Sequence, residues 1–433
     1  MRTFDLKYGK TTLPLSIEDQ RVLNVVNGAP YPAIEKIETA FLEALDNPIG
    51  TKALKDIVQP NESVCVVVSD ITRGWIGYHR FLPLLLNYLN EAGIPDEKIF
   101  LLIAYGAHRM QSEQECIVAF GEEVCKRVNI HHSCASVPES TYRRIGTTSA
   151  GVPIEINELA LDADRIILTG GIVYHLMAGY GAGRKGILPG ISSYEAIQKN
   201  HVFCLGPNVG DGCNPENRSG NIKTNAMHDD QLEHAKAVDA DFLINVVNNA
   251  EGKLARFMTG HWYEAWYEGT RTIDKIFGVE ISGLADCAIA SAGGYPNDIN
   301  LYQGVKTIDN AIKAVVPGGV AIILEELPDI GEPAEFINWF DTVDLYEREV
   351  KLRAGFTVPG FIALNLGEAA HRYHIIMVTR EENIEKVEKT GLIGVTSLEA
   401  ALEKAKALLG KEDFTVNILP TGATTMPILK ETN

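Results

Sequence analysis

The sequence has few features that would tie it to a membrane, to nucleic acid or to an oxidising compartment. Its seven cysteines are odd in number and no two have CxxC spacing, which argues against a disulfide framework and against a thiolate zinc site. No apolar run approaches the length of about 18 residues that a membrane span requires. Asp and Glu outnumber Lys and Arg by 57 to 39, and the net charge of −18 repels phosphate backbones and anionic lipid. We therefore expect neither nucleic acid nor a membrane as a partner.

The sequence also begins without the signature of a secreted protein. Residues 1–7 have no cationic segment followed by an apolar one, so we expect no secretory signal and predict a cytoplasmic protein. A composition of 45% hydrophobic and 22% charged residues is typical of a folded globular chain. At about 150 residues per domain, the length predicts two to three domains.

Short apolar runs alternate with amphipathic stretches along the chain. The runs are mostly rich in β-branched residues and bounded by Gly, Asp or Asn, which is typical of buried strands. Amphipathic stretches between them indicate helices packed around mostly parallel sheets. The predicted strands are 63–69, 98–104, 165–169, 242–247, 287–291, 320–324 and 373–378. The predicted helices are 80–92, 112–127, 301–315 and 397–408.

A break near residues 268–276 separates the earlier strands from a second set. We therefore predict two α/β domains: residues 1–270, and residues 275–414, with a tail, 415–433, that returns to the first domain. A cleft between two such domains is a common place for a small-molecule site. Residues 206–225 are rich in Gly, Asn, Asp and Pro, and they predict a long loop of the kind that is often functional.

Candidate functional residues follow the first two predicted strands. Asp70, Thr72 and Arg73 come at the end of the strand 63–69, and His108 follows the strand 98–104. Open α/β sheets bind ligands beyond the carboxyl ends of their strands, and histidine suits acid–base work because it titrates near neutral pH. Both groups also have a structural interpretation. Asp70 and Thr72 can cap a helix beside a surface arginine, and His108 can be a lone structural histidine.

The glycine-dense stretch after the strand 165–169 is the most informative one. Residues 181–186 match GxGxxG, but they do not directly follow the strand, and Lys185 is not followed by Ser or Thr. Neither a dinucleotide fingerprint nor a P-loop is therefore indicated. What remains is a loop that brings backbone close to a ligand, with Arg184 and Lys185 as its cations. His175 and His201 lie on either side of it, at a spacing that does not fit a zinc site.

The second predicted domain offers one helical side. Tyr302 and Lys306 lie four residues apart on the helix 301–315, with Gln303 beside them. Lys306 suits an anionic substrate, although a solvated helical face gives the same pattern. We expect surface or capping roles for His79, His228, His234, His261, His371 and His374.

Taken together, these stretches resemble the nickel-dependent lactate racemase family. Members of that family have two α/β domains and carry pyridinium-3,5-bisthiocarboxylic acid mononucleotide, which holds nickel as a sulfur–carbon–sulfur pincer. One arm of that nucleotide is attached to a lysine as a thioamide. The matching segments are 4–17, 70–73 (DITR), 106–109 (GAHR), 146–157, the loop around Lys185, Asn200-His201, 245–248, 295–306 and 419–422.

The resemblance implies a role for each candidate. Lys185 matches the lysine that tethers the cofactor, and so carries one sulfur arm of the metal site, while His201 matches the histidine ligand of nickel. His108 and His175 match the paired acid–base residues. The implied cofactor-binding residues are Asp70, Ile71, Thr72, Arg73, Gly179, Gly181, Gly183 and Lys185. The implied substrate-binding residues are Arg73, Tyr302, Gln303 and Lys306.

The implied activity is the racemisation or epimerisation of a 2-hydroxy acid. The α-hydrogen of such a substrate is hardly acidic, because the neighbouring carboxylate is already anionic. Moving this hydrogen as hydride to a pyridinium ring is easier, provided that a base takes the hydroxyl proton. The ketone can then accept hydride on either face, which requires a base on each side. Soft sulfur and carbon donors with one imidazole suit Ni(II), and the cofactor performs the difficult step.

The sequence departs from lactate-specific members at three places. Residues 179–183 read GYGAG where those members have GYSGG, residues 74–77 replace a Pro-containing stretch, and residues 356–361 lack the usual Trp or His-Lys features. We predict that Trp75 and Phe361 reshape the pocket for another 2-hydroxy acid, larger or with a second polar group. The expected partners are this acid and the enzymes that build the cofactor. The alternatives are an NAD-type 2-hydroxy acid oxidoreductase and a nickel or nucleotide carrier.

Overall fold

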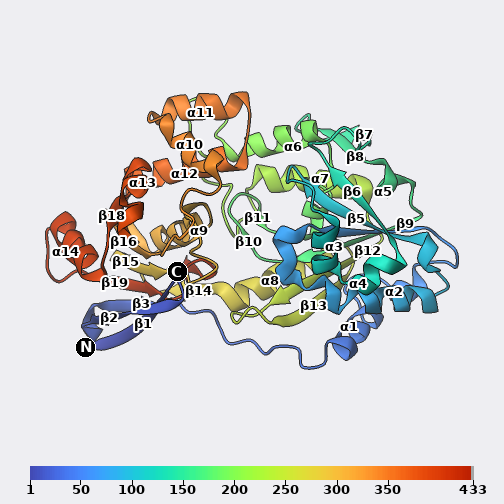
Figure 1. Cartoon of the computed structure of the whole chain (residues 1–433), viewed down its shortest axis with the longest axis horizontal. Coiled ribbons are helices and arrows are strands. Elements are labelled where there is room, and N and C mark those ends of the chain that lie inside the picture. Colours follow the sequence, from blue (N-terminus) through green and yellow to red (C-terminus); the bar gives the residue numbers. More distant parts are fainter. Residues whose placement is uncertain (431–433) are drawn as a thin grey trace. The chain divides into compact units, whose positions relative to one another are not determined.

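A computed structural model describes residues 1–430 of the chain, which form two compact units (Figure 1). Unit 1 contains Met1–Ala29, Leu205–Asn214 and the chain from Asp274 onward, and unit 2 contains Pro30–Cys204 and Pro215–Ile273. The prediction of two α/β domains with mostly parallel sheets is confirmed. The division differs from the predicted one, because the first 29 residues and the tail belong to the same unit as the C-terminal half. No helix within residues 1–430 is both long and apolar enough to cross a bilayer.

Unit 2 is built on a six-stranded sheet in the order β13-β12-β9-β4-β5-β6. The edge strand β13 is antiparallel to β12, and the other neighbours are parallel. From β4 the chain adds β5 and β6 on one side and later returns to add β9 and β12 on the other. The order therefore reverses between β4 and β9, the position where open α/β sheets bind ligands. The strands are β4 (Val64–Ser69), β5 (Ile99–Gly106), β6 (Asn129–Cys134), β9 (Arg165–Gly171), β12 (Phe242–Asn248) and β13 (Leu254–Gly260).

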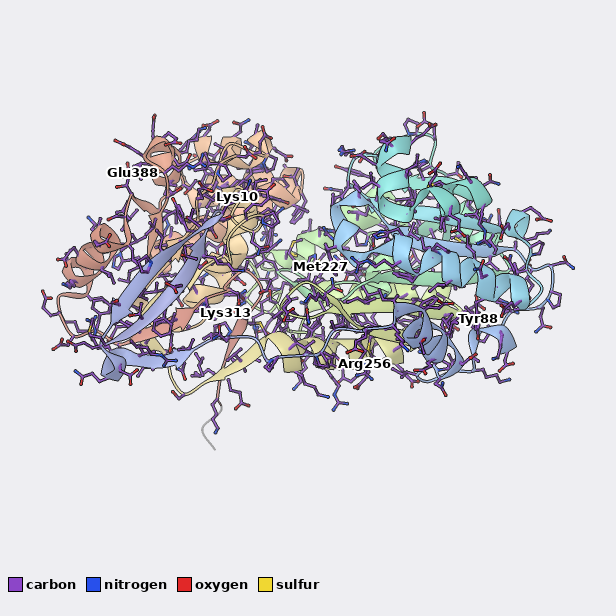
Figure 2. All side chains as sticks on the ribbon, turned by 60° about the horizontal axis from the view of Figure 1, so that its bottom comes forward. Lys10, Tyr88, Met227, Arg256, Lys313 and Glu388 are labelled. Carbon is purple, nitrogen blue, oxygen red and sulfur yellow. The ribbon has the colours of Figure 1, made fainter. Side chains whose placement is uncertain are left out.

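The two faces of this sheet have different partners. Val64, Val66 and Val68 of β4 point into a core formed with α1, α2, α3 and α4, as strand alternation requires. On the other face, Val67 lies against Gly186 of the loop after β9. Figure 2 labels Tyr88 of α2 and Met227 of α7, two buried side chains of unit 2. The helices are α1 (Ile37–Asp46), α2 (Leu82–Glu91), α3 (Glu113–Phe120), α4 (Glu122–Arg127), α5 (Glu158–Asp162), α6 (Tyr194–His201) and α7 (Ala226–Val238).

Unit 1 is built on six parallel strands in the order β18-β17-β16-β15-β19-β3. Because β3 pairs with β19, the N-terminal segment belongs to this sheet. A second reversal of strand order lies between β15 and β19. The strands are β3 (Val22–Val25), β15 (Ala285–Ser291), β16 (Val315–Leu324), β17 (His374–Val378), β18 (Ile393–Val395) and β19 (Val416–Leu419).

The sheet of unit 1 is covered on both faces. Val320, Ile322 and Leu324 of β16 pack with the hairpin β1 (Arg2–Tyr8)–β2 (Thr11–Ile17) and with α14 (Leu398–Leu409). The helix α9 (Leu301–Ile312) packs against β15 and β16, and α12 (Val358–Arg372) packs against α9. The remaining elements of this unit include α10 (Ala334–Asn338), α11 (Leu345–Ala354), α13 (Ile384–Lys389), β14 (Gly278–Ile281) and β20 (Met426–Leu429).

A short segment, Leu205–Asn214, is fixed in unit 1 by carboxylates. Glu349 of α11 accepts hydrogen bonds from the backbone N–H groups of Gly210 and Gly212, each at 3.0 Å. Glu368 of α12 accepts one from Cys213 at 2.8 Å. This segment is part of the predicted loop 206–225, and it is irregular as expected.

All seven predicted strands are confirmed, as β4, β5, β9, β12, β15, β16 and β17. Two other predictions, one of a helix and one of a break between domains, are corrected. The predicted helix 112–127 is two helices, because Gly121 between them adopts φ +91°. The predicted break at 268–276 lies inside a continuous helix, α8 (Glu264–Phe277), within which the two units divide.

Candidate functional site

The predicted site residues of unit 2 follow three neighbouring strands. Asp70 directly follows β4 and caps the short turn η3 (Ile71–Ile76), accepting from the N–H of Thr72. His108 comes two residues after β5, and His175 comes shortly after β9, in the two-residue strand β10 (Tyr174–His175). Because the carboxyl ends of β9, β4 and β5 lie side by side, these segments meet where the strand order reverses.

Asp70 is buried and orients His108. Its Oδ2 lies 2.7 Å from Nδ1 of His108, and its Oδ1 accepts from both the N–H and the hydroxyl of Thr72. Burial raises the pKa of Asp70, but the hydrogen bond and charge of His108, with Thr72 and Arg73, outweigh it and hold this pKa below its ordinary value. Asp70 is therefore a carboxylate that accepts from Nδ1–H of His108. This leaves Nε2 of His108 to take or give a proton.

Lys185 lies in the short turn η6 (Gly183–Gly186), against the face of β4 and β9. Gly183 has φ +55°, and a Cβ there would collide with the ring of Trp266. Burial, with the charges of Arg184 and Arg73, lowers the pKa of Lys185 to about 7. Near neutral pH a large share of the amine is unprotonated, which is its nucleophilic form.

His201 is the last residue of α6 and is 5% exposed. Its Nδ1 lies 2.8 Å from the carbonyl oxygen of Ile197. A carbonyl can only accept, so Nδ1 carries the proton and Nε2 carries the lone pair that a metal requires. Burial and the charge of Lys185 lower the pKa of His201 to about 3, although the bond to Ile197 opposes this. The ring is therefore neutral at physiological pH, as a metal ligand must be.

His175 is the opposite tautomer from His108. Its Nδ1 accepts from the backbone N–H groups of Met177 at 3.2 Å and Ala178 at 3.1 Å, so its proton is on Nε2. Burial first, and then the charge of Lys185, hold the pKa of His175 well below its ordinary value. The two predicted acid–base histidines are therefore not equivalent.

Unit 2 brings five of the predicted residues together. The charges of Lys185, Arg73 and His201 all act on His175, and those of Lys185 and His108 act on His201. The amine of Lys185 is thus close to the imidazoles of His175 and His201, and the residue is partly buried.

The backbone of the glycine loop is fixed by its neighbours. Gly179 has φ +76°, and a Cβ there would collide with the carbonyl oxygen of Asn221. The carbonyl of Gly181 accepts from the indole of Trp266 at 2.9 Å. Ala182 also has a positive φ, +56°, in a conformation that favours glycine. Ile71, another predicted cofactor-binding residue, donates its N–H to Gln111 at 2.7 Å.

The predicted substrate-binding residues Tyr302, Gln303 and Lys306 belong to unit 1, in the first half of α9. Nζ of Lys306 lies 2.7 Å from Oε1 of Gln303. The ring of Tyr302 packs edge-on against Phe336, with centroids 5.6 Å apart.

Arg184 is a structural cation and not a cation presented to a ligand. It is 1% exposed, donates to the carbonyls of Ala178 and Tyr180, and lies 4.3 Å from the centroid of the Trp266 ring. It therefore shapes the loop that contains Lys185, and this interpretation replaces the expectation from the sequence.

Two further expectations are wrong. His228 and His234 are not surface residues, because they are 3% and 0% exposed. His228 stacks on Trp266 behind the glycine loop. Phe361 is 2% exposed and stacks on Phe356, so it packs in the core of unit 1, and its predicted effect on the substrate pocket stays a prediction. By contrast, Trp75 is 39% exposed, and its ring lies against Gly171 at the end of β9.

Cys204 is one neighbour of the site that sequence reasoning missed. It is fully buried, its pKa is raised to about 12 by burial, and the charge of Lys185 acts on it. Its position three residues after His201 was the available signal. Within residues 1–430, no group of three or more His, Cys, Asp or Glu side chains is arranged as a metal site.

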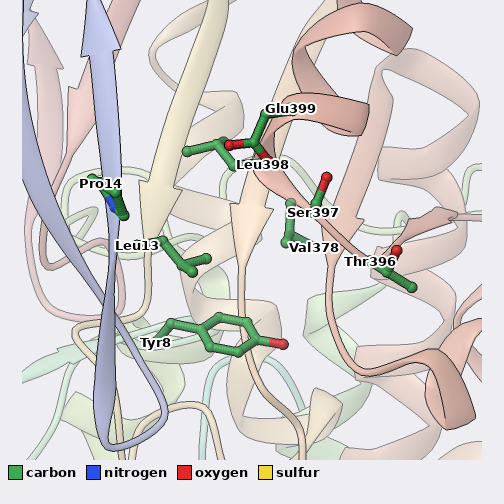
Figure 3. A pocket seen from close by; sticks show the side chains of 8 residues that line it. All are labelled: Tyr8, Leu13, Pro14, Val378, Thr396, Ser397, Leu398 and Glu399. Atoms are coloured by element: carbon green, nitrogen blue, oxygen red, sulfur yellow. The ribbon is translucent and has the colours of Figure 1, made fainter.

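A small pocket in unit 1 contains none of the predicted site residues (Figure 3). It lies between the hairpin β1–β2 and the start of α14. It combines apolar and polar side chains, and its lining residues are Tyr8, Leu13, Pro14, Val378, Thr396, Ser397, Leu398 and Glu399. We assign it no part in the site of unit 2.

Comparison with known proteins gives a consistent result over the whole chain. Residues 8–212 match the model of the lactate racemase N-terminal domain, and residues 281–426 match that of the lactate racemase C-terminal domain. The lactate racemase of Thermoanaerobacterium thermosaccharolyticum is 32% identical over 431 residues, which cover 98% of each chain. That of Lactiplantibacillus plantarum is 28% identical over 439 residues, which cover 98% of this chain and 99% of the relative.

Solved structures agree with these matches. The structure of the lactate racemase apoprotein from T. thermosaccharolyticum has a TM-score of 0.87 at 30% identity, and the match covers 99% of this chain and 100% of the other. A protein from Thermotoga maritima shares the fold, with a TM-score of 0.66 at 17% identity over 93% of this chain and 100% of the other. The chain is a member of the lactate racemase family.

Proposed function

We propose that the protein racemises or epimerises a 2-hydroxy acid, using a nickel-pincer nucleotide tethered to Lys185. The observation that carries this proposal is the desolvated amine of Lys185, with a pKa of about 7, next to His175 and His201. A lysine on a structural turn has no need of two neighbouring imidazoles, whereas a lysine that forms a thioamide beside a metal ligand and an acid–base histidine does.

The residues of unit 2 fit such a group. Acylation of Lys185 requires the unprotonated amine, which its low pKa provides. His201 has the tautomer that places its lone pair on Nε2 for nickel. Arg73 supplies a cation for the phosphate of the nucleotide or for the substrate carboxylate. When bound, the group supplies a pyridinium ring that accepts and returns hydride, and a nickel ion that polarises the reacting centre.

The chain itself manages the proton and the position of the substrate. We assign to Nε2 of His108 the removal of the hydroxyl proton, because the Asp70 carboxylate stabilises the resulting imidazolium. A proton-transfer group placed in this way contributes roughly a hundred- to ten-thousand-fold in rate. His175 has the matching role on the other face. It must move its proton from Nε2 to Nδ1 and give up two backbone N–H bonds to act as a base, which makes it the weaker base of the two.

The substrate is proposed as a 2-hydroxy acid other than lactate. Arg73, Tyr302, Gln303 and Lys306 are assigned to its carboxylate and to a second polar group. The exposed ring of Trp75, close in sequence to Arg73, supports a substrate with a larger side chain.

The test is intact-mass analysis of the protein made together with the cofactor-building enzymes. We expect the mass of the nucleotide on the wild type and on Lys199→Ala, an exposed lysine in an ion pair with Glu195, but not on Lys185→Ala. The loaded protein is then screened with single-enantiomer 2-hydroxy acids, and activity is read as loss of optical purity. A protein of native mass with full racemase activity would refute the tether.

The same screen separates the two alternatives. An NAD-type oxidoreductase would accumulate a 2-keto acid and need added NAD. A nickel or nucleotide carrier would keep its ligand uptake after His108→Ala or His175→Ala and would have no turnover to lose.

A further inference from the structure

Four buried oxygen atoms without hydrogen-bond partners come from three residues of unit 1. They are Oδ1 of Asp298, Oγ1 of Thr307 and both carboxyl oxygens of Glu325. All three residues are 0% exposed. The hydroxyl of Thr307 is close enough to the carboxyl group of Glu325 to lower its pKa, although the pair lacks full hydrogen-bond geometry. Buried polar atoms are normally paired, so this group of three residues requires an explanation.

Glu325 lies between the sheet and α9. It directly follows β16, whose residues Val320, Ile322 and Leu324 face the hairpin and α14, so strand alternation directs Glu325 to the opposite face. That face is covered by α9. A Cβ on Gly304 of α9 would collide with Oε2 of Glu325, so the absence of a side chain at this position makes room for the carboxyl group.

Asp298 lies in the loop between β15 and α9. Its Oδ2 accepts from the N–H of Gly9 at 2.6 Å and from that of Glu326 at 3.3 Å. These bonds attach the turn of the hairpin and the end of β16 to the loop that leads into α9. Both donors are backbone N–H groups, and they leave Oδ1 of Asp298 without a partner.

Within residues 1–430, no basic side chain is among the groups that act on Glu325. Among residues 1–430, Asp298 is the charged residue whose field acts on Glu325; α9 contributes the hydroxyl of Thr307, and β17 contributes only the carbonyl of Val378, which accepts from the N–H of Glu325. Arg380, which follows β17, is paired with Glu326. Burial first, then the charge of Asp298, raise the pKa of Glu325 to about 8, although Thr307 opposes this. Two negative charges at this buried position would be strongly unfavourable, so the two carboxyl groups together must bind a positive charge.

We propose that Glu325 and Asp298 form a proton-binding site beneath α9, which takes one proton from water on folding and keeps it at neutral pH. Glu325 is then a neutral carboxylic acid, its O–H bond formed with a proton from solvent, and Asp298 stays ionised. A proton fits the place better than a metal ion does, because Oε2 lies against the backbone of α9 at Gly304. Ionisation of Glu325 would put a second negative charge between the sheet and α9 and weaken their contact.

The direction of the pH effect follows from linkage. The carboxyl group of an unfolded chain has its ordinary pKa of 4.5, and the folded value is about 8. Between these values the folded protein holds one proton more than the unfolded protein, so stability falls as the pH rises through the window and levels off above it. One proton corresponds to about a tenfold change in the unfolding equilibrium constant per pH unit.

The test compares the wild type with Glu325→Gln, which keeps the shape of the neutral acid and cannot ionise. We expect the unfolding equilibrium constant of the wild type, measured by chemical denaturation, to rise about tenfold per pH unit between pH 6 and pH 8. We expect Glu325→Gln to lack this component and Glu399→Gln, at an exposed position of α14, to keep it. Equal pH dependence in the wild type and Glu325→Gln would overturn the proposal.

A second measurement needs no variant. The infrared spectrum of the wild type at pH 6 should contain the C=O band of a buried protonated carboxyl group, and this band should disappear above pH 9. Its absence at pH 6 would overturn the proposal, as would stabilisation by added Mg²⁺ or Ca²⁺ that Glu325→Gln abolishes, because that result assigns the site to a metal ion. Neither test uses catalytic activity, so both stand apart from the proposed function. If that function holds, ionisation would also disturb Tyr302, Gln303 and Lys306, which α9 carries.

Discussion

The substitution Asp70→Asn tests the acid–base arrangement most directly. The carboxylate lies 2.7 Å from Nδ1 of His108 and accepts a hydrogen bond from its N–H. An asparagine keeps the shape and the bond from the N–H of Thr72, but its amide would present N–H to Nδ1. His108 would then carry its proton on Nε2, the wrong tautomer for a base, and its imidazolium would lose the neighbouring charge.

The expected loss can be worked from these two effects. A hydrogen bond to a charged group contributes about 1.5–3 kcal/mol, or about ten- to a hundredfold in rate when it is needed only in the transition state. The inverted tautomer removes the base itself, which is worth roughly a hundred- to ten-thousand-fold. We therefore expect kcat to fall by about 10²- to 10⁴-fold.

The assay is loss of optical purity from one enantiomer of whichever 2-hydroxy acid the wild type turns over, at saturating substrate. Intact mass should show the adduct on Lys185 unchanged, which separates lost chemistry from lost loading. Asp96→Asn serves as the control, because Asp96 is a second ion-paired aspartate of unit 2, bound to Arg127 outside the site. A loaded Asp70→Asn variant with less than tenfold loss of kcat would refute the assigned role of His108.

Two further predictions concern the glycine loop. Ala182→Gly should stabilise the protein by about 1 kcal/mol, because Ala182 has φ +56° and glycine adopts this conformation without strain; a denaturation curve unchanged or shifted to lower denaturant would contradict this. Arg184→Lys should destabilise it by about 2–4 kcal/mol in the same assay, because an ammonium group cannot reproduce the fork that binds the carbonyls of Ala178 and Tyr180; a loss under 1 kcal/mol would show that charge alone suffices at this position.

The strands could be predicted because their apolar runs are short, β-branched and bounded by turn residues. The shorter or more polar strands β3, β6, β18 and β19 were not predicted, because pairing within the sheet, and not their own composition, makes them strands. The helix α8 was read as a break for a related reason. Its sequence is polar enough to resemble a linker. The helix is stabilised instead by Trp266, which packs against Tyr180 and Arg184 of the glycine loop.

The site was predicted in outline because strand ends and glycine loops leave a local signal. The orientation of its side chains left none. Nothing in the sequence distinguishes Arg184, which is buried against Trp266, from Lys185, whose amine lies near His175 and His201. Likewise, the different tautomers of His108 and His175 depend on one carboxylate and on two backbone N–H groups that only folding brings into place.

The interleaving of the two units has a consequence for anyone who wishes to divide this protein. Each unit is assembled from separate stretches, so a cut at residue 273 would leave β3 without its neighbour β19 and would leave the Leu205–Asn214 segment without the carboxylates that hold it. Neither half is a self-sufficient module. A chimera that exchanges the unit carrying α9 between relatives must therefore transplant its three segments together, or buried apolar side chains of the remaining segments will be exposed.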